Sequence, residues 1–192
     1  MIVITNPIAV ANEISLIHSL FAEGLSLLHI RKPDFSEAEM KTFLSAIGWE
    51  VANRLVLHSH HHLGNEYGIN RFHLSKAQRN TTFIKSDGIY SASTHSIKEF
   101  NDLNQNFQHA FLSPIYKSIS KTDYDSKINH FQTLEQRTNF ATKLVALGGL
   151  SSENIQETLE NGFDEIALLG TVWNSKNPLE NFKKCQQIVH SF

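Results

Sequence analysis

Short runs of apolar residues recur along the chain, and each run ends in polar or small residues. Near-continuous apolar runs of this length are typical of strands that are buried on both faces of a parallel sheet. The pattern predicts eight such strands, at residues 2–5, 25–30, 54–58, 71–74, 88–92, 109–112, 143–147 and 165–169.

Helical patterns lie between most of these strands. The segment 12–21 places its apolar residues on one face, and Ser36 with Glu39 forms the pattern of a capping box at a helix start. Gly162 is typical of a helix end and Pro178 of a first helical turn. We therefore expect further helices at 96–103, 134–140, 152–161 and 178–190, and short connections after the third and fourth strands.

The alternation of eight strands with helices in 192 residues predicts an α/β fold, a single (β/α)8 TIM barrel with one domain over residues 1–192. An open doubly wound sheet is the alternative. That fold usually has a glycine-rich turn after its first strand, where this chain reads TNPIAV. The closed barrel is therefore the favoured prediction.

The composition excludes several classes of protein. Hydrophobic residues make up 41% of the chain, and 17 basic against 19 acidic residues leave no basic surface for nucleic acid. No run approaches the roughly 20 apolar residues of a membrane span, and the first residues lack the basic start of a signal peptide. We expect a cytoplasmic protein without a membrane partner, whose one cysteine, Cys185, forms no intramolecular disulfide.

Polar side chains follow the predicted strands, at the end of a barrel where active sites lie. Few of them are acidic, which favours an anionic ligand. The candidates at the ends of the first six strands are Asn6, His29, Arg31, Lys32, His58, Ser59, His60, His73, Ser75, Ser93, His95 and Ser113.

The last two strand ends carry glycines. Gly148 and Gly149 follow the seventh strand, and Gly170 with Thr171 follows the eighth. Glycine lets backbone N–H groups approach an anion, and this is the usual phosphate site of the fold. A tight turn or a helix cap is the simpler interpretation of a glycine pair, but the position favours phosphate binding.

Residues 58–62 read HSHHH. Imidazole is a ligand of transition metals, but neither a cysteine nor an acid stands nearby at ligand spacing. His58 and His60 alternate along the strand and so share a face. We expect His58 or His60 to line the substrate pocket and expect no metal site in this segment.

Five segments resemble those of one family. They are LLHIRKPD, INRFHLS, YSASTHS, FLSPIYKSISK and LVALGGLSSEN, in this order. In sequence and spacing they are similar to the motifs of the thiamine phosphate synthase family and its TenI-like thiazole tautomerase relatives. The resemblance implies an enzyme that joins a phosphorylated thiazole to an aminopyrimidine methyl pyrophosphate and releases pyrophosphate, normally with Mg²⁺ and without an organic cofactor.

The resemblance also implies roles for individual residues. Arg31 and Lys121, with His29 in the place of a family glutamine, would be catalytic. Gly148, Gly149, Gly170 and Thr171 would hold the thiazole phosphate, and the long loop around Lys121 would close over the pyrophosphate. The remaining substrate-binding candidates are Lys32, His58, His73, Ser93, His95, Ser113, Ser118 and Ser120.

The chain departs from the family pattern at its metal ligands. An Asn-Asp pair after the third strand is replaced by His58 and Ser59, and a second Asp by Gln78. Mg²⁺ prefers anionic oxygen ligands, so these changes argue against a bound Mg²⁺. The tautomerases need no metal, but they carry a catalytic histidine where this chain has Pro114.

Three functions therefore stay open: a synthase, which is favoured, a metal-free tautomerase, and a non-catalytic binder of thiamine phosphate or its precursors. The histidines at the strand ends could supply acid–base chemistry in place of the missing groups. Each function predicts small phosphorylated heterocycles as partners, and the family resemblance adds self-association into a homo-oligomer.

Overall fold

The computed structural model describes residues 1–80, 87–116 and 130–192. Within them the strands form a closed parallel barrel in sequence order, and β1 pairs with β8 to complete the ring. The fold prediction is confirmed. The strands are β1 (Ile2–Ile4), β2 (Leu27–Ile30), β3 (Leu55–Leu57), β4 (Arg71–Leu74), β5 (Ile89–Thr94), β6 (Phe107–Leu112), β7 (Lys143–Leu147) and β8 (Glu165–Leu168).

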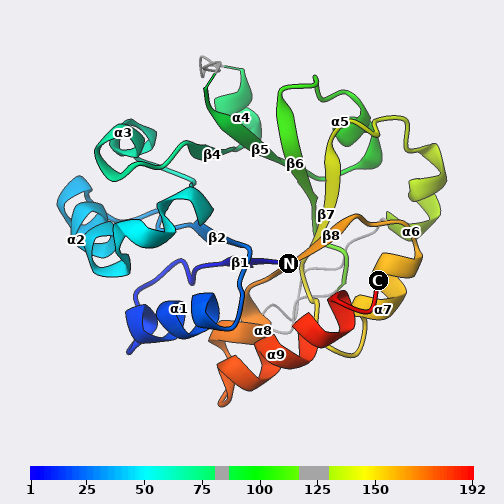
Figure 1. Cartoon of the computed structure of the whole chain (residues 1–192). Coiled ribbons are helices and arrows are strands. Elements are labelled where there is room, and N and C mark those ends of the chain that lie inside the picture. The colour runs from blue at the N-terminus through cyan, green and yellow to red at the C-terminus, as the bar shows by residue number, and fades with distance from the viewer. Residues whose placement is uncertain (81–86, 117–129) are drawn as a thin grey trace.

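Helices surround the ring of strands (Figure 1). Ser36 caps α2 in the expected capping box, and Ser75 caps α4 in the same way with Gln78. The longer helices are α1 (Glu13–Ala22), α2 (Glu37–Ile47) and α9 (Pro178–Val189); shorter ones are α3 (Gly64–Tyr67), α4 (Lys76–Arg79), α5 (Ile97–Asn101), α6 (His130–Thr133), α7 (Ile155–Glu160) and α8 (Gly170–Trp173). Short 3₁₀ helices are η1 (Trp49–Arg54), η2 (His61–Leu63) and η3 (Leu134–Gln136).

The predicted helix at 134–140 is wrong. Only η3 is helical there, and the chain then runs without regular structure to β7. The Asn139 side chain accepts hydrogen bonds from the backbone N–H groups of Ala141 and Thr142, at 3.1 and 3.2 Å. Such local side-chain bonds offer the backbone an alternative to the helix. Arg137 adds a 2.6 Å ion pair to Asp164 that anchors this connection to the start of β8.

Alternation along the strands divides the core into two regions. Leu28 and Ile30 pack outward in the layer shared with the helices, whereas His29 between them lies inside the ring against Phe111, with ring centroids 4.9 Å apart. The inner apolar cluster consists of Ile2, Ile4, Phe111, Val145 and Ala167. The interior is thus apolar on the β1, β6, β7 and β8 side and rich in imidazole on the β2 and β4 side.

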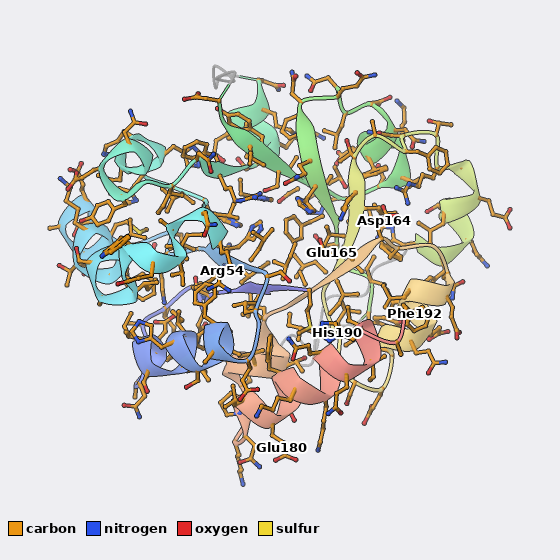
Figure 2. All side chains as sticks on the ribbon, in the orientation of Figure 1. Arg54, Asp164, Glu165, Glu180, His190 and Phe192 are labelled. Atoms are coloured by element: carbon orange, nitrogen blue, oxygen red, sulfur yellow. The ribbon has the colours of Figure 1, made fainter. Side chains whose placement is uncertain are left out.

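Charged groups interact with one another at the N-terminal end of the barrel. The Met1 ammonium group lies 3.1 Å from Glu165, and the same carboxylate lies 3.3 Å from Nε2 of His109. Glu165 lies toward the middle of the ring, beside the start of β1 (Figure 2). Burial alone would raise the pKa of Glu165, but His109 and the terminal ammonium outweigh it and lower that pKa to about 2. No described helix has the length and apolar character needed to cross a membrane.

Candidate active site

A pocket of about 760 Å³ opens at the C-terminal ends of the strands. One part of its wall is apolar and is made by Ile4, Phe111, Leu147 and Leu169. The predicted candidates that also line it are Arg31, Lys32, His58, Ser59, His73, Ser75, Ser93 and His95. No carboxylate lines it among the described residues. Such a pocket suits a ligand that combines flat heterocyclic surface with negative charge.

Arg31 is an exposed cation of this pocket, and Thr5 holds its backbone in place. Its N–H donates to Oγ1 of the buried Thr5 at 2.8 Å, and that hydroxyl donates to the Arg31 carbonyl at 3.2 Å. No described carboxylate pairs with the Arg31 guanidinium. The side chain therefore has its bidentate donors available for an anion in the pocket.

Lys32 is placed differently from its neighbour. Its side chain is 0% exposed. The ammonium group donates to both Glu13 carboxylate oxygens at 2.7 Å and to the Ile8 carbonyl at 3.0 Å. The rings of Phe35 and Phe43 lie 5.4 and 5.1 Å from it. Substrate binding by Lys32 stays a prediction, and the structure uses the group inside the protein, between β2 and α1.

Three histidines from neighbouring strands gather at the inner end of the pocket. Nδ1 of His29 lies 3.0 Å from Nε2 of His58, and the His58 and His73 rings stack with centroids 4.1 Å apart. His73 also lies between two hydroxyls, with Nδ1 2.9 Å from Ser91 and Nε2 2.8 Å from Ser93. His29 and His73 are buried, and His58 is half-buried at the pocket wall.

Burial keeps these imidazoles neutral. Desolvation, reinforced by the other positive groups nearby, lowers the pKa of His73 to about 3 and lowers the pKa values of His29 and His58 well below 6.5. A group with so low a pKa is a weak base at neutral pH. The neutral rings can accept or donate hydrogen bonds and can offer a lone pair.

The remaining histidines of the predicted set lie farther out. His95 is exposed, and its Nδ1 lies 2.9 Å from the carbonyl of Ser113, which links the ends of β5 and β6. Nδ1 of His60 lies 3.1 Å from the hydroxyl of Ser59, and His62 pairs with Glu37 on the surface. Of the two alternatives in residues 58–62, the structure brings His58 and not His60 to the pocket.

The two glycine loops lie beside each other and follow the pocket-lining residues Leu147 and Leu169, although Gly148, Gly149, Gly170 and Thr171 are not themselves among the lining residues. Tyr116 donates its N–H to the Gly148 carbonyl at 3.1 Å, and the Thr171 hydroxyl donates to the Leu150 carbonyl. Gly148 has φ +103°, and a Cβ there would lie 3.1 Å from Pro114. Within the described residues, the N–H groups of Gly148, Gly149 and Gly170 have no protein acceptor. Donors in this arrangement fit a phosphate group.

The sequence interpretation missed part of the site. Lys76 at the start of α4 lines the pocket and forms a 2.6 Å ion pair with Glu99. It also missed the apolar wall, although strand periodicity alone would point Ile4 and Phe111 inward. The predicted residues Ser118, Ser120 and Lys121 lie outside the described residues.

Comparison with known proteins gives one consistent family. Residues 1–172 match the family described as thiamine monophosphate synthase. The chain is 29% identical over 92 residues to a thiamine-phosphate synthase of Prochlorococcus marinus, and 26% identical over 109 residues to one of Anoxybacillus flavithermus. These matches cover 47% and 54% of this chain but 26% and 48% of the relatives, so the chain spans less than half the length of the curated relatives it matches.

Solved structures agree with the sequence matches. A thiamine phosphate pyrophosphorylase from Bacteroides thetaiotaomicron superposes with a TM-score of 0.81 at 29% identity, over 99% of this chain and 97% of that one. One from Pyrococcus furiosus gives a TM-score of 0.78 at 15% identity, over 99% and 95% of the two chains. The second likeness shows the shared barrel fold.

Proposed function

The chain belongs to the thiamine monophosphate synthase family, and we propose that it joins a thiazole phosphate to an aminopyrimidine methyl pyrophosphate. The observation that carries this proposal is the pocket. It combines an apolar wall with the cation of Arg31 and contains no described carboxylate, and its lining residues Leu147 and Leu169 are followed in the chain by glycines whose N–H groups have no described acceptor. The flat rings of two phosphorylated heterocycles need an apolar wall, and their phosphate groups need cations and N–H donors without a carboxylate nearby.

The reaction breaks the bond between the pyrimidine methylene carbon and the pyrophosphate oxygen, and the electron pair leaves with pyrophosphate. Arg31 stabilises the negative charge that develops on this leaving group, and Ser93 at the pocket wall can donate its hydroxyl to it. The thiazole nitrogen then forms the new bond to the methylene carbon. We assign the thiazole phosphate to the N–H groups of Gly148, Gly149 and Gly170, with Lys121, Ser118 and Ser120 as further ligands of the pyrophosphate.

The buried histidines bear on the choice between a synthase and a tautomerase. Because burial lowers the pKa of His73 to about 3, His73 stays neutral at neutral pH. The same neutrality makes it a weak general base, which supports the synthase over a tautomerase that relies on these rings.

The described residues do not fit Mg²⁺. The positions of the family carboxylates hold Ser59 and Gln78, and the Gln78 side chain accepts the Ser75 N–H at 2.8 Å to cap α4. Mg²⁺ is held through carboxylates or phosphates in near-octahedral oxygen geometry, and a hydroxyl and an amide are weak substitutes. The protein therefore supplies no described Mg²⁺ ligand set, and Arg31 bears more of the charge stabilisation.

Thiamine phosphate formation from both substrates, with and without Mg²⁺, tests the proposal. We expect turnover by the unaltered chain and at least about a hundredfold loss in Arg31→Ala, as for the removal of one charge-stabilising donor. Lys98→Ala, which removes an exposed cation paired with Asp102 away from the pocket, is the matched control. Absence of product together with saturable binding of thiazole phosphate would refute the synthase and leave the tautomerase and the non-catalytic binder.

A further inference from the structure

The donor atoms of the three-histidine cluster are arranged like those of a metal site. One ring nitrogen each from His29, His58 and His73 lies within 4.8 Å of the others, and no other group of this kind occurs among the described residues. His29 and His73 belong to β2 and β4, and His58 directly follows β3 and donates its N–H to the Ile30 carbonyl at 3.1 Å, so hydrogen-bonded neighbouring strands hold the cluster. A rigid scaffold of this kind limits how far the nitrogens can separate.

We propose that His29, His58 and His73 bind one divalent transition-metal ion of the zinc type. Imidazole suits Zn²⁺, Co²⁺ and Ni²⁺, and three imidazoles form a known ligand set of open zinc sites. The site rests on the imidazole cluster and not on the proposed synthase reaction.

Binding requires the ligand nitrogens, which lie within 4.8 Å of one another, to rearrange around one point. Metal–nitrogen bonds of about 2.0–2.1 Å place two tetrahedral ligand nitrogens about 3.3 Å apart. The nearest pair, Nδ1 of His29 and Nε2 of His58, is 3.0 Å apart and must open slightly. The His73 ring lies at 19° to that of His58 and must tilt to turn its lone pair toward the same point.

Hydroxyl groups are in place to orient the third ligand. Ser91 and Ser93 lie at hydrogen-bond distance from the two ring nitrogens of His73. Whichever nitrogen binds the ion, the other keeps a serine oxygen as acceptor for its N–H. Ligating histidines almost always have such a partner, which fixes the tautomer and the ring orientation.

The fourth coordination position faces the pocket. His58 and His73 line it, so a water molecule or an anionic oxygen of a ligand can reach the ion from that side. Three neutral ligands leave the ion its full double charge. In a pocket without a described carboxylate, this charge would lie beside Arg31 and add to the attraction for phosphorylated ligands.

The test uses the full chain without a polyhistidine tag, stripped with a chelator and titrated with Co²⁺, without either substrate. We expect one equivalent of Co²⁺ with the visible absorption of a four-coordinate nitrogen site, displaced by Zn²⁺ and not by Mg²⁺. His58→Ala and His73→Gln should each weaken this binding more than about 100-fold, which is more than the loss of a residue hydrogen-bonded to a ligating histidine would cause. The control is the double variant His60→Ala with His62→Ala, two nearby histidines outside the cluster.

The proposal is overturned if the unaltered chain binds no stoichiometric Co²⁺, or if the control abolishes binding that His58→Ala retains. Far-UV circular dichroism shows whether each variant folds. For a variant that does not fold, the Co²⁺-shifted imidazole N–H resonances of the unaltered chain decide the question. Three coordinated rings support the site, and any other number refutes it. Failure of the synthase assay leaves these results unaffected, because no substrate is present.

Discussion

Replacement of Lys32 by methionine should destabilise the barrel, although the side chain stands in the segment that resembles a ligand-binding motif. Methionine fills nearly the same volume between the rings of Phe35 and Phe43 but removes the charge that pairs with Glu13. Glu13 is 5% exposed, so its carboxylate would then lie in the interior without its cation. The variant therefore isolates the contribution of one buried ion pair.

The expected loss in the free energy of unfolding is about 3 kcal/mol, the lower end of the range for breaking a buried pair from one side. The lower end applies because Glu13 can take up a proton. Burial already raises the pKa of Glu13, and the hydrogen bond and charge of Lys32 oppose that rise. Without Lys32 the pKa rises further above its unfolded value. The stability difference between the variant and the unaltered chain should therefore be smallest below pH 4.5 and grow as pH increases through the raised pKa.

Urea unfolding followed by circular dichroism, at several pH values, measures both effects. The double variant Lys32→Met with Glu13→Leu should recover most of the loss, because a hydrophobic pair of similar volume can replace a buried ion pair. Lys98→Met breaks an exposed pair with Asp102 and should change stability little. Unchanged stability in Lys32→Met, with loss of pyrophosphate binding, would refute this reasoning and assign Lys32 to the ligand.

Three further predictions concern the rim, the histidines and the anion site. Gly148→Ala should cost about 1–3 kcal/mol in urea unfolding, and more than Gly162→Ala, since both have positive φ but only the first meets a neighbouring atom. Stability should fall as pH drops from 6.5 toward 3, because the unfolded chain binds a proton that folded His73 excludes, and His73→Gln should flatten that slope. Arg31→Ala should weaken inorganic pyrophosphate binding about tenfold or more in calorimetry, with an unchanged unfolding midpoint.

The barrel could be predicted because its signals are local and repeated. Each strand carries its own apolar run, and Ser36 with Glu39 marks a helix start that the structure confirms. The helix prediction at 134–140 failed because the contacts that decide this segment lie outside it. Its end is decided by bonds from Asn139 to the backbone beyond it and to Phe100, and by the Arg137 pair with Asp164 across the start of β8. Propensity within the segment contains no information about those partners.

The position of the site could be predicted from the sequence, but the roles of its individual residues could not. Strand ends indicated that Arg31, His58 and His73 share one pocket, because parallel strands bring their C-terminal ends together. The sequence could not separate Arg31 from Lys32. Adjacent residues point in different directions, and the deciding contact is with Glu13, 19 positions earlier in the chain. Tertiary pairing of this kind cannot be read from the motif.

The departures from the family pattern are physically connected. His29 and His58 replace two polar family residues on neighbouring strands, and their nitrogens lie 3.0 Å apart. Gln78, in the place of a carboxylate, caps α4 through Ser75 and so retains a structural use. The pocket thus has Ser59 and Gln78 where the family has carboxylates, and it contains three contacting imidazoles, a donor set that suits a borderline ion better than a hard one. If the metal titration succeeds, these departures together amount to a change of metal; if it fails, the anionic substrate relies on Arg31 and backbone N–H groups, with Lys121 as the remaining predicted cation.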